Sequence, residues 1–167
     1  INLDLTRALA RHGLHFAPDP SSQQACTVGG NVANNSGGPH CLAYGVTSAH
    51  VLAVEVVLPD GTVTVLGGLD AEPAGLDLRG AFVGSEGMLA VITEVTVKLT
   101  PKPQIARCIM ASFDDVRRAG DAVANIIATG IIPAGLEMMD KPMTAAVEDY
   151  VHAGYDLTAE AILLEVV

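Results

Sequence analysis

The sequence has no tryptophan, only three phenylalanines and three tyrosines, and few basic residues. Nine lysines and arginines stand against 19 acidic residues, which gives a formal net charge of −10. A nucleic-acid backbone needs clustered cations to release its counterions, so this charge argues against a nucleic-acid partner. Long hydrophobic runs are also missing, and because a spanning helix needs roughly 20 apolar residues, we expect no membrane span.

Cysteine is scarce as well, with Cys26, Cys41 and Cys108 the only three in the chain. Their odd number and the absence of CxxC spacing fit a reducing compartment better than a disulfide framework. The five histidines show neither HxH nor HExxH spacing, so we expect no metal site made within this chain. No basic segment followed by an apolar one opens the chain, and we therefore expect a cytoplasmic location.

Hydrophobic residues make up half of the 167 residues, enough for one sizeable core or for one complete unit and part of another. The chain starts at Ile1 without a methionine, and it ends on an apolar, strand-like run at Val167. We therefore expect an internal piece of a longer protein.

Hydrophobic periodicity predicts an opening helix that ends near His12, followed later by three strands. Residues 51–58 are apolar on nearly both faces, which is typical of a strand covered on both sides. Asp60-Gly61 predicts a tight hairpin turn, after which residues 62–66 return. Residues 67–80 are typical of an irregular loop, and the alternation over residues 91–100 predicts a strand with one wetter face.

Pro101 and Pro103 should end the ladder of hydrogen bonds, because each proline removes a donor, and we place a domain border at residue 103. Beyond it the pattern alternates strands with helices, which is typical of an α+β unit. The expected strands are residues 105–113, 131–139 and 162–167. One helix, capped by Asp114 or Asp115, is expected to end near residue 128, and a second helix is expected over residues 141–151.

Glycine and asparagine crowd into residues 27–38, TVGGNVANNSGG. Glycine is favoured where another group must approach the main chain without a Cβ in the way. Val28 and Val32 would anchor a turn of helix and leave main-chain N–H groups facing outward, a surface that suits an anionic or polar planar ligand. A turn cluster that merely links two elements explains the same composition.

A second glycine cluster, Gly84-Ser85-Glu86-Gly87, leads directly into the alternating strand. Neither cluster matches G-x-x-x-x-G-K-[ST], and G-x-G-x-x-G is absent, so nucleoside-triphosphate and nicotinamide binding lack their motifs.

Four segments in order resemble a known family: DPSS (19–22), TVGGNVANNSGGPHCLAYGVT (27–47), VLPDG (57–61) and GSEGMLAVITEV (84–95). They are similar to the second half of the FAD-binding domain of the vanillyl-alcohol-oxidase (PCMH) type, in the branch of glycolate oxidase subunit GlcD and the D-lactate and D-2-hydroxyglutarate dehydrogenases. IIPAGLEMMD and AILLEVV resemble the start of that family's substrate-capping domain.

The resemblance implies an α+β fold with two parts. Residues 1–103 would be the C-terminal half of the FAD-binding domain, and residues 104–167 the N-terminal part of an α+β (ferredoxin-like) capping domain. It implies a flavoprotein that oxidises a small 2-hydroxy acid, of the glycolate or D-lactate type, by hydride transfer to FAD while a base takes the hydroxyl proton. The catalytic base, the family's metal ligands and its pyrophosphate loop would lie outside this sequence, so the chain alone should be inactive.

The resemblance also implies which residues line the cofactor, mostly through main-chain N–H groups and small polar side chains. They are Pro20, Ser21, Ser22, Thr27, Gly29, Gly30, Asn34, Asn35, Ser36, Gly37, Gly38, Glu86, Gly87 and Ile92. Ile92 would act through its main chain or be only a core residue, and Glu86 would approach the cofactor or cap a local turn. His40 would serve as an acid, a base or a flavin contact, or cap a loop.

Electrons would pass to a partner, an iron–sulfur subunit in a complex peripheral to the inner membrane. Two alternatives remain at this point. One is a related flavoenzyme with another alcohol substrate, similar to alkyl-glycerone-phosphate synthase or alditol oxidase. The other is a flavin-free, non-catalytic binding module.

Overall fold

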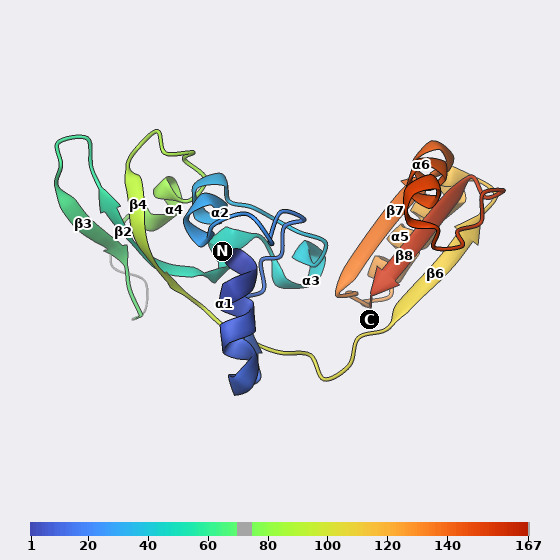
Figure 1. Cartoon of the computed structure of the whole chain (residues 1–167), viewed down its shortest axis with the longest axis horizontal. Helices are drawn as coiled ribbons and strands as arrows, with labels where there is room; N and C mark the ends of the chain where they lie inside the picture. The colour runs from blue at the N-terminus through green and yellow to red at the C-terminus, as the bar shows by residue number, and fades with distance from the viewer. Residues whose placement is uncertain (70–74, 167) are drawn as a thin grey trace. The chain divides into compact units, whose positions relative to one another are not determined.

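The structure is a computed structural model that describes residues 1–69 and 75–166. The chain forms two compact units, Ile1–Pro103 and Gln104–Val167. Each unit combines helices with an antiparallel sheet, so the predicted α+β class is confirmed (Figure 1).

The first unit is built on a three-stranded antiparallel sheet with the order β3-β2-β4. β2 (Val51–Val57) is the central strand, β3 (Val63–Gly67) lies on one side and β4 (Val91–Val97) on the other. Val57 pairs with Val63 across the turn at Asp60-Gly61, which confirms the predicted hairpin. A second, two-stranded ladder joins β1 (Leu14–His15) to β5 (Thr100–Pro101).

The first unit also contains short helices. They are α1 (Asn2–Leu9), the 3-10 helix η1 (Ala10–His12), α2 (Val28–Asn34), α3 (Cys41–Tyr44), the 3-10 helix η2 (Thr47–His50) and α4 (Leu78–Phe82). The opening helical segment ends at His12 before a left-handed Gly13, as the sequence predicts. α4 lies where the sequence predicts a loop, because Asp77 caps it by accepting a hydrogen bond from the Gly80 N–H at 3.0 Å. Residues 70–74 of that predicted loop lie outside the described residues.

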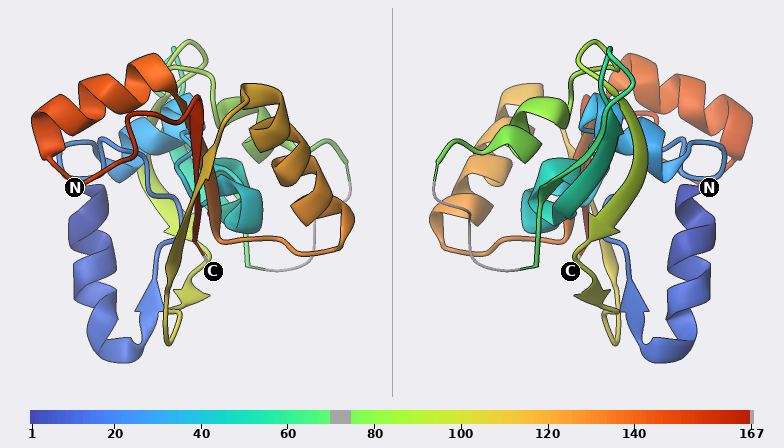
Figure 2. Two further views of the ribbon diagram at one scale, coloured as in Figure 1. Left: turned by 90° about the vertical axis from the view of Figure 1, so that its right-hand side faces the viewer. Right: turned by 90° about the vertical axis from the view of Figure 1, so that its left-hand side faces the viewer.

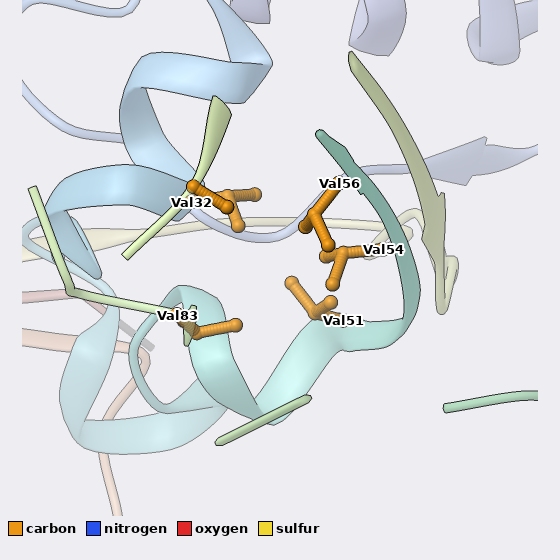
Figure 3. Packing of buried hydrophobic residues seen from close by; sticks show 6 residues of the cluster. Val32, Val51, Val54, Val56 and Val83 are labelled. Atoms are coloured by element: carbon orange, nitrogen blue, oxygen red, sulfur yellow. The ribbon is translucent and has the colours of Figure 1, made fainter. Parts of the chain in front are cut away.

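Valine side chains form the core between α2 and the inner face of the sheet. Val32, Val51, Val54 and Val56 are at most 1% exposed, and Val83 packs against them. Figure 3 shows these side chains converging. The core therefore fixes one face of α2 on the sheet and directs its other face away from it.

β4 departs from the strict alternation that the sequence predicts. Ile92 pairs with Val56 and Glu94 with Glu55, so Thr93 is an extra residue and forms a bulge. Ile92 and Val95, three residues apart, consequently both pack against the core. A single inserted residue reverses which side chains face inward.

Pro101 was expected to end strand pairing, but it pairs with Leu14 in the two-residue ladder of β1 and β5. A strand at a sheet edge can tolerate proline, because the missing N–H is not required on its open side. The expectation failed because it treated Pro101 as part of a longer ladder.

The second unit contains a three-stranded antiparallel sheet and two helices. The strands, in the order β6-β8-β7, are β6 (Cys108–Phe113), β8 (Ala161–Val166) and β7 (Gly135–Asp140), and the helices are α5 (Val116–Ala128) and α6 (Lys141–Val151). Figure 2 shows α5 and α6 on opposite faces of this sheet. Ala161, Ile162 and Leu163 are at most 4% exposed, and because successive strand residues face opposite sides, both faces are covered at that end of β8.

Side-chain caps place both helices of the second unit where the sequence predicts them. Asp115 accepts from the Arg117 N–H and Asp140 from the Met143 N–H. Two strands begin later than predicted. β6 starts at Cys108 rather than at residue 105, and β7 starts at Gly135 because Pro133 has no N–H for a ladder.

The loop after α6 is fastened by one carboxylate. Glu148 accepts hydrogen bonds from the N–H groups of Gly154 and Tyr155, each at 3.0 Å. These bonds, first that of Tyr155 and then that of Gly154, lower the pKa of Glu148, because they favour its ionised form. The loop is therefore held by a charge that acid removes.

We expect this loop to loosen only in acid. Because the folded pKa of Glu148 lies below the ordinary value of about 4.3, its contribution is complete above that pH and is lost as pH falls through the lowered pKa. The amide proton shifts of Gly154 and Tyr155 should titrate together with a midpoint below about 4.3, and Glu148→Gln should abolish this titration. A midpoint at or above the ordinary value would contradict the assignment.

Candidate functional site

The first half of the glycine-rich stretch forms α2. Thr27 caps the helix, since its Oγ1 accepts a hydrogen bond from the Gly30 N–H at 2.9 Å. Asn34 donates to the Gly30 carbonyl, also at 2.9 Å. Val32 faces the core, whereas, apart from the chain neighbours of Gly29 and the backbone of its own helix, no atom of the described residues lies within 4 Å of the place that a Cβ on Gly29 would occupy. The described residues thus give no steric reason for glycine at position 29.

The second half of the stretch turns away from the helix at Asn35, which has the left-handed φ of 48° that asparagine tolerates. Its Oδ1 accepts from the Ser48 N–H at 2.8 Å. The Ser36 carbonyl accepts from both the main-chain N–H and the hydroxyl of Thr47, at 3.0 and 2.6 Å. These bonds to η2 fix the main chain that leads into Gly37 and Gly38.

The two glycine clusters meet at the C-terminal end of α2. The Gly84 N–H donates to the Val32 carbonyl at 2.9 Å, and the Glu86 N–H donates to the Ala33 carbonyl at 2.8 Å. Gly84 has a φ of 84°, and a Cβ there would lie 3.2 Å from the Asn35 Cβ. Segments far apart in the sequence are therefore in direct contact.

A third loop joins them. A Cβ on Gly38 would overlap the main-chain oxygen and the carboxylate of Asp19, so these two segments touch through bare main chain. The Asn2 side-chain amide donates to the Pro18 carbonyl at 2.9 Å and holds this loop from the other side. We call Pro18–Ser22 the first segment, Asn34–Gly38 the second segment and Gly84–Gly87 the third segment.

Several main-chain N–H groups on the three segments donate no hydrogen bond within residues 1–69 and 75–166. They include those of Ser21, Ser22, Gly37 and Gly87. All four residues are at least partly exposed. Unpaired N–H groups gathered on adjoining loops are available to the oxygens of an anionic or polar ligand.

Backbone strain marks the third segment. Glu86 has a φ of 53°, a left-handed conformation that costs a side chain with a Cβ about 1–2 kcal/mol. Its side chain is exposed, and its main-chain bond to Ala33 holds the conformation. Strained residues of this kind concentrate at functional sites.

The structure brings most of the predicted cofactor residues together and leaves one apart. Those on the first, second and third segments adjoin one another, and Thr27, Gly29 and Gly30 lie on α2, which leads into the second segment. Ile92 lies on β4, and its side chain packs against the core. The side chain of Ile92 is thus a core contact and does not lie on the three segments.

Of the residues that hold the segments in place, the sequence indicated only His40, for which a loop cap was one expected role; it contacts Asp19. Sequence reasoning missed Thr47, which contacts Ser36, and Ser48, which contacts Asn35. No local pattern indicates these pairs, because the partners are separated by ten or more residues and meet only in the folded chain. No group of three or more metal-ligating side chains gathers within the part of the chain that is described.

Main-chain N–H groups presented by adjoining loops can bind the polar groups of a cofactor. Residues 1–67 match the family model for the FAD binding domain, and residues 102–166 match the model for FAD linked oxidases, C-terminal domain. The chain belongs to the FAD-linked oxidases.

Curated relatives agree with this family. The chain is 58% identical over 163 residues to glycolate oxidase subunit GlcD of Escherichia coli K12, covering 98% of this chain and 33% of that protein. It is 46% identical over 165 residues to the same subunit of Bacillus subtilis 168, covering 98% and 35%. A D-lactate dehydrogenase of Anaerostipes hadrus is 34% identical over 148 residues, covering 88% and 31%. The chain thus spans about a third of the length of these relatives.

The fold has a counterpart among solved structures. Alkyldihydroxyacetonephosphate synthase superimposes with a TM-score of 0.81 at 24% identity, covering 99% of this chain and 33% of that one. This likeness shows the shared fold alone.

FAD is the cofactor of this family, and the segments fit it. Its phosphates and the polar edge of its ring accept hydrogen bonds, which the unpaired N–H groups of Ser21, Gly37 and Gly87 can donate. The open space over Gly29 lets a planar group approach the main chain of α2. Within the described residues, no helix has the length and apolar character needed to cross a membrane.

Proposed function

We propose that this chain acts within a longer FAD-dependent oxidoreductase that oxidises a small 2-hydroxy acid of the glycolate or D-lactate type. The observation that supports the proposal is the meeting of three loops whose main-chain N–H groups have no hydrogen-bond partner within the described residues and are therefore available to a ligand. The names of the curated relatives, glycolate oxidase subunit and D-lactate dehydrogenase, support the substrate class. Their length, about three times that of this chain, supports a longer polypeptide.

The residues proposed to hold the cofactor divide by role. Ser21, Ser22, Gly37 and Gly87 donate main-chain hydrogen bonds, and Gly29 provides close approach. Bound flavin supplies the two-electron acceptor for the oxidation, and this chain supplies position. The remaining residues proposed to line the site are Pro20, Thr27, Gly30, Asn34, Asn35, Ser36, Gly38, Glu86 and the main chain of Ile92.

The proposal extends to the setting of the protein. A cytoplasmic protein that passes electrons to an iron–sulfur subunit at the inner membrane is proposed on the family resemblance. Co-purification of the full-length protein with an iron-containing subunit supports this arrangement, and purification as an isolated, fully active flavoprotein contradicts it.

The test of the function uses the full-length protein. We expect it to purify yellow, with visible flavin absorbance that bleaches without oxygen when glycolate or D-lactate is added. The chain of residues 1–167 alone should fold but stay colourless, since it presents only part of a binding surface. A full-length protein that folds and takes up no added FAD would remove the proposal, and so would flavin that neither acid reduces.

A further inference from the structure

His40 pairs with the carboxylate of Asp19. Its Nδ1 lies 2.5 Å from Oδ2 of Asp19, although the two residues are 21 positions apart. Their side chains are 34% and 22% exposed, so the pair is partly shielded from water. An ionised carboxylate only accepts hydrogen bonds, and Nδ1 is therefore the donor.

This contact lies beside the close approach of Gly38 to Asp19. The Gly38 N–H also donates to the Cys41 sulfur at 2.9 Å, which orients the main chain between Gly38 and the helix α3. Asp19 thus makes both contacts. Its main-chain oxygen and Oδ1 lie against Gly38, and its Oδ2 accepts the hydrogen bond from the His40 ring. The first and second segments are fastened at this one residue.

The ring of His40 has further support from Tyr44, one helical turn later. Their ring centroids are 6.5 Å apart, and the Tyr44 N–H donates to the His40 carbonyl at 3.0 Å. The Tyr44 ring in turn makes an edge contact with His15, at 5.8 Å between centroids. Neighbouring rings limit the rotamers of His40, so little entropy is lost when it binds Asp19.

We propose that Asp19 and His40 form a positioning pair that sets the spacing between the first and second segments, and through it the fit of the cofactor. The inference rests on the proposed function, because these segments are the ones assigned to FAD. Ser21 lies two residues after Asp19 and Gly37 directly precedes Gly38, so the unpaired N–H groups of both residues lie next to this junction in the chain. A change in their spacing alters both hydrogen bonds to one ligand, which weakens binding without removing a contact residue.

The experiment compares variants of the flavin-loaded full-length protein. His40→Leu removes the donor, and His40→Asn keeps an N–H where Nδ1 lies. His12→Leu is the matched control, because His12 is exposed and its ring bonds to the adjacent Arg11. The readouts are the FAD dissociation constant and the visible spectrum of bound flavin.

We expect His40→Leu to weaken FAD binding about tenfold and to shift the flavin spectrum, and His40→Asn to restore both to within about threefold of the wild type, because a hydrogen bond to a charged group is among the stronger ones. Asp19→Asn, which keeps the shape and loses the charge, should weaken binding about threefold. It carries the test if His40→Leu does not fold.

Two results overturn the inference. The first is His40→Leu, or Asp19→Asn, with the affinity and spectrum of His12→Leu. The second is His40→Asn as impaired as His40→Leu, which would show that the imidazole itself and not its hydrogen bond matters. A wild-type protein that takes up no FAD is a different outcome, because it contradicts the proposed function.

Discussion

Replacing Gly38 with alanine should destabilise the first unit by about 3 kcal/mol, since overpacking a tight contact costs 1–3 kcal/mol and here the neighbours cannot move aside easily. The added Cβ would overlap a main-chain oxygen and the carboxylate of Asp19, which is itself bonded to His40. Native-state hydrogen exchange of the β2 amides measures this loss, because β2 is the central strand of the unit.

Gly13→Ala gives a comparison that separates crowding from backbone strain. Gly13 has a φ of 68° and no atom within 4 Å of the place of a Cβ, so its cost comes from conformation alone, about 1 kcal/mol. Gly38 has no such φ, and its cost is steric. If Gly38→Ala changes the opening free energy by less than about 0.5 kcal/mol, the junction between the first and second segments is not as tight as the structure shows.

Gly29→Ala should separate stability from binding. Alanine is about 0.5–1 kcal/mol better than glycine within a helix, and no protein atom obstructs the new methyl group, so α2 should become more stable. The same methyl group would occupy the space proposed for FAD, and binding should weaken at least about tenfold. Fluorescence titration of FAD into the full-length apoprotein measures the affinity.

The second unit offers a matched control for this variant. Gly120 lies within α5, and a Cβ there also meets nothing within 4 Å. Gly120→Ala should stabilise its helix to a similar degree and leave FAD affinity unchanged. Equal FAD affinity in the two variants would show that the open face of α2 does not adjoin the cofactor.

Local signals explain why much of the fold could be predicted from the sequence. α6 covers Lys141–Val151 as expected, because Asp140 caps it and the chain leaves the helix at His152 in a left-handed conformation. The β2–β3 hairpin follows from Asp60-Gly61 between two apolar runs. Each of these signals lies within a few residues of the element it defines.

Features that depend on distant partners could not be predicted in this way. The bulge at Thr93 appears only when β4 pairs with β2, and the ladder of Pro101 appears only when residues 14 and 15 lie beside it. Periodicity within one segment carries no information about register against another.

The same distinction applies to the candidate site. Glycine clusters and the family resemblance predict which stretches would face a ligand, because bare main chain has a clear composition. The contact of Gly84 with α2 and the pair Asp19–His40 arise from tertiary packing of loops. Sequence therefore indicated the surface, whereas the structure identified what holds it in shape.

A crystal structure of the full-length protein with bound FAD tests the central claim most directly. We expect the dinucleotide to contact the main chain of α2 at Gly29 and of the second and third segments at Gly37 and Gly87. We also expect Asp19 and His40 to remain paired beside the cofactor. A structure in which these loops pack as ordinary turns, with FAD bound elsewhere, would contradict it.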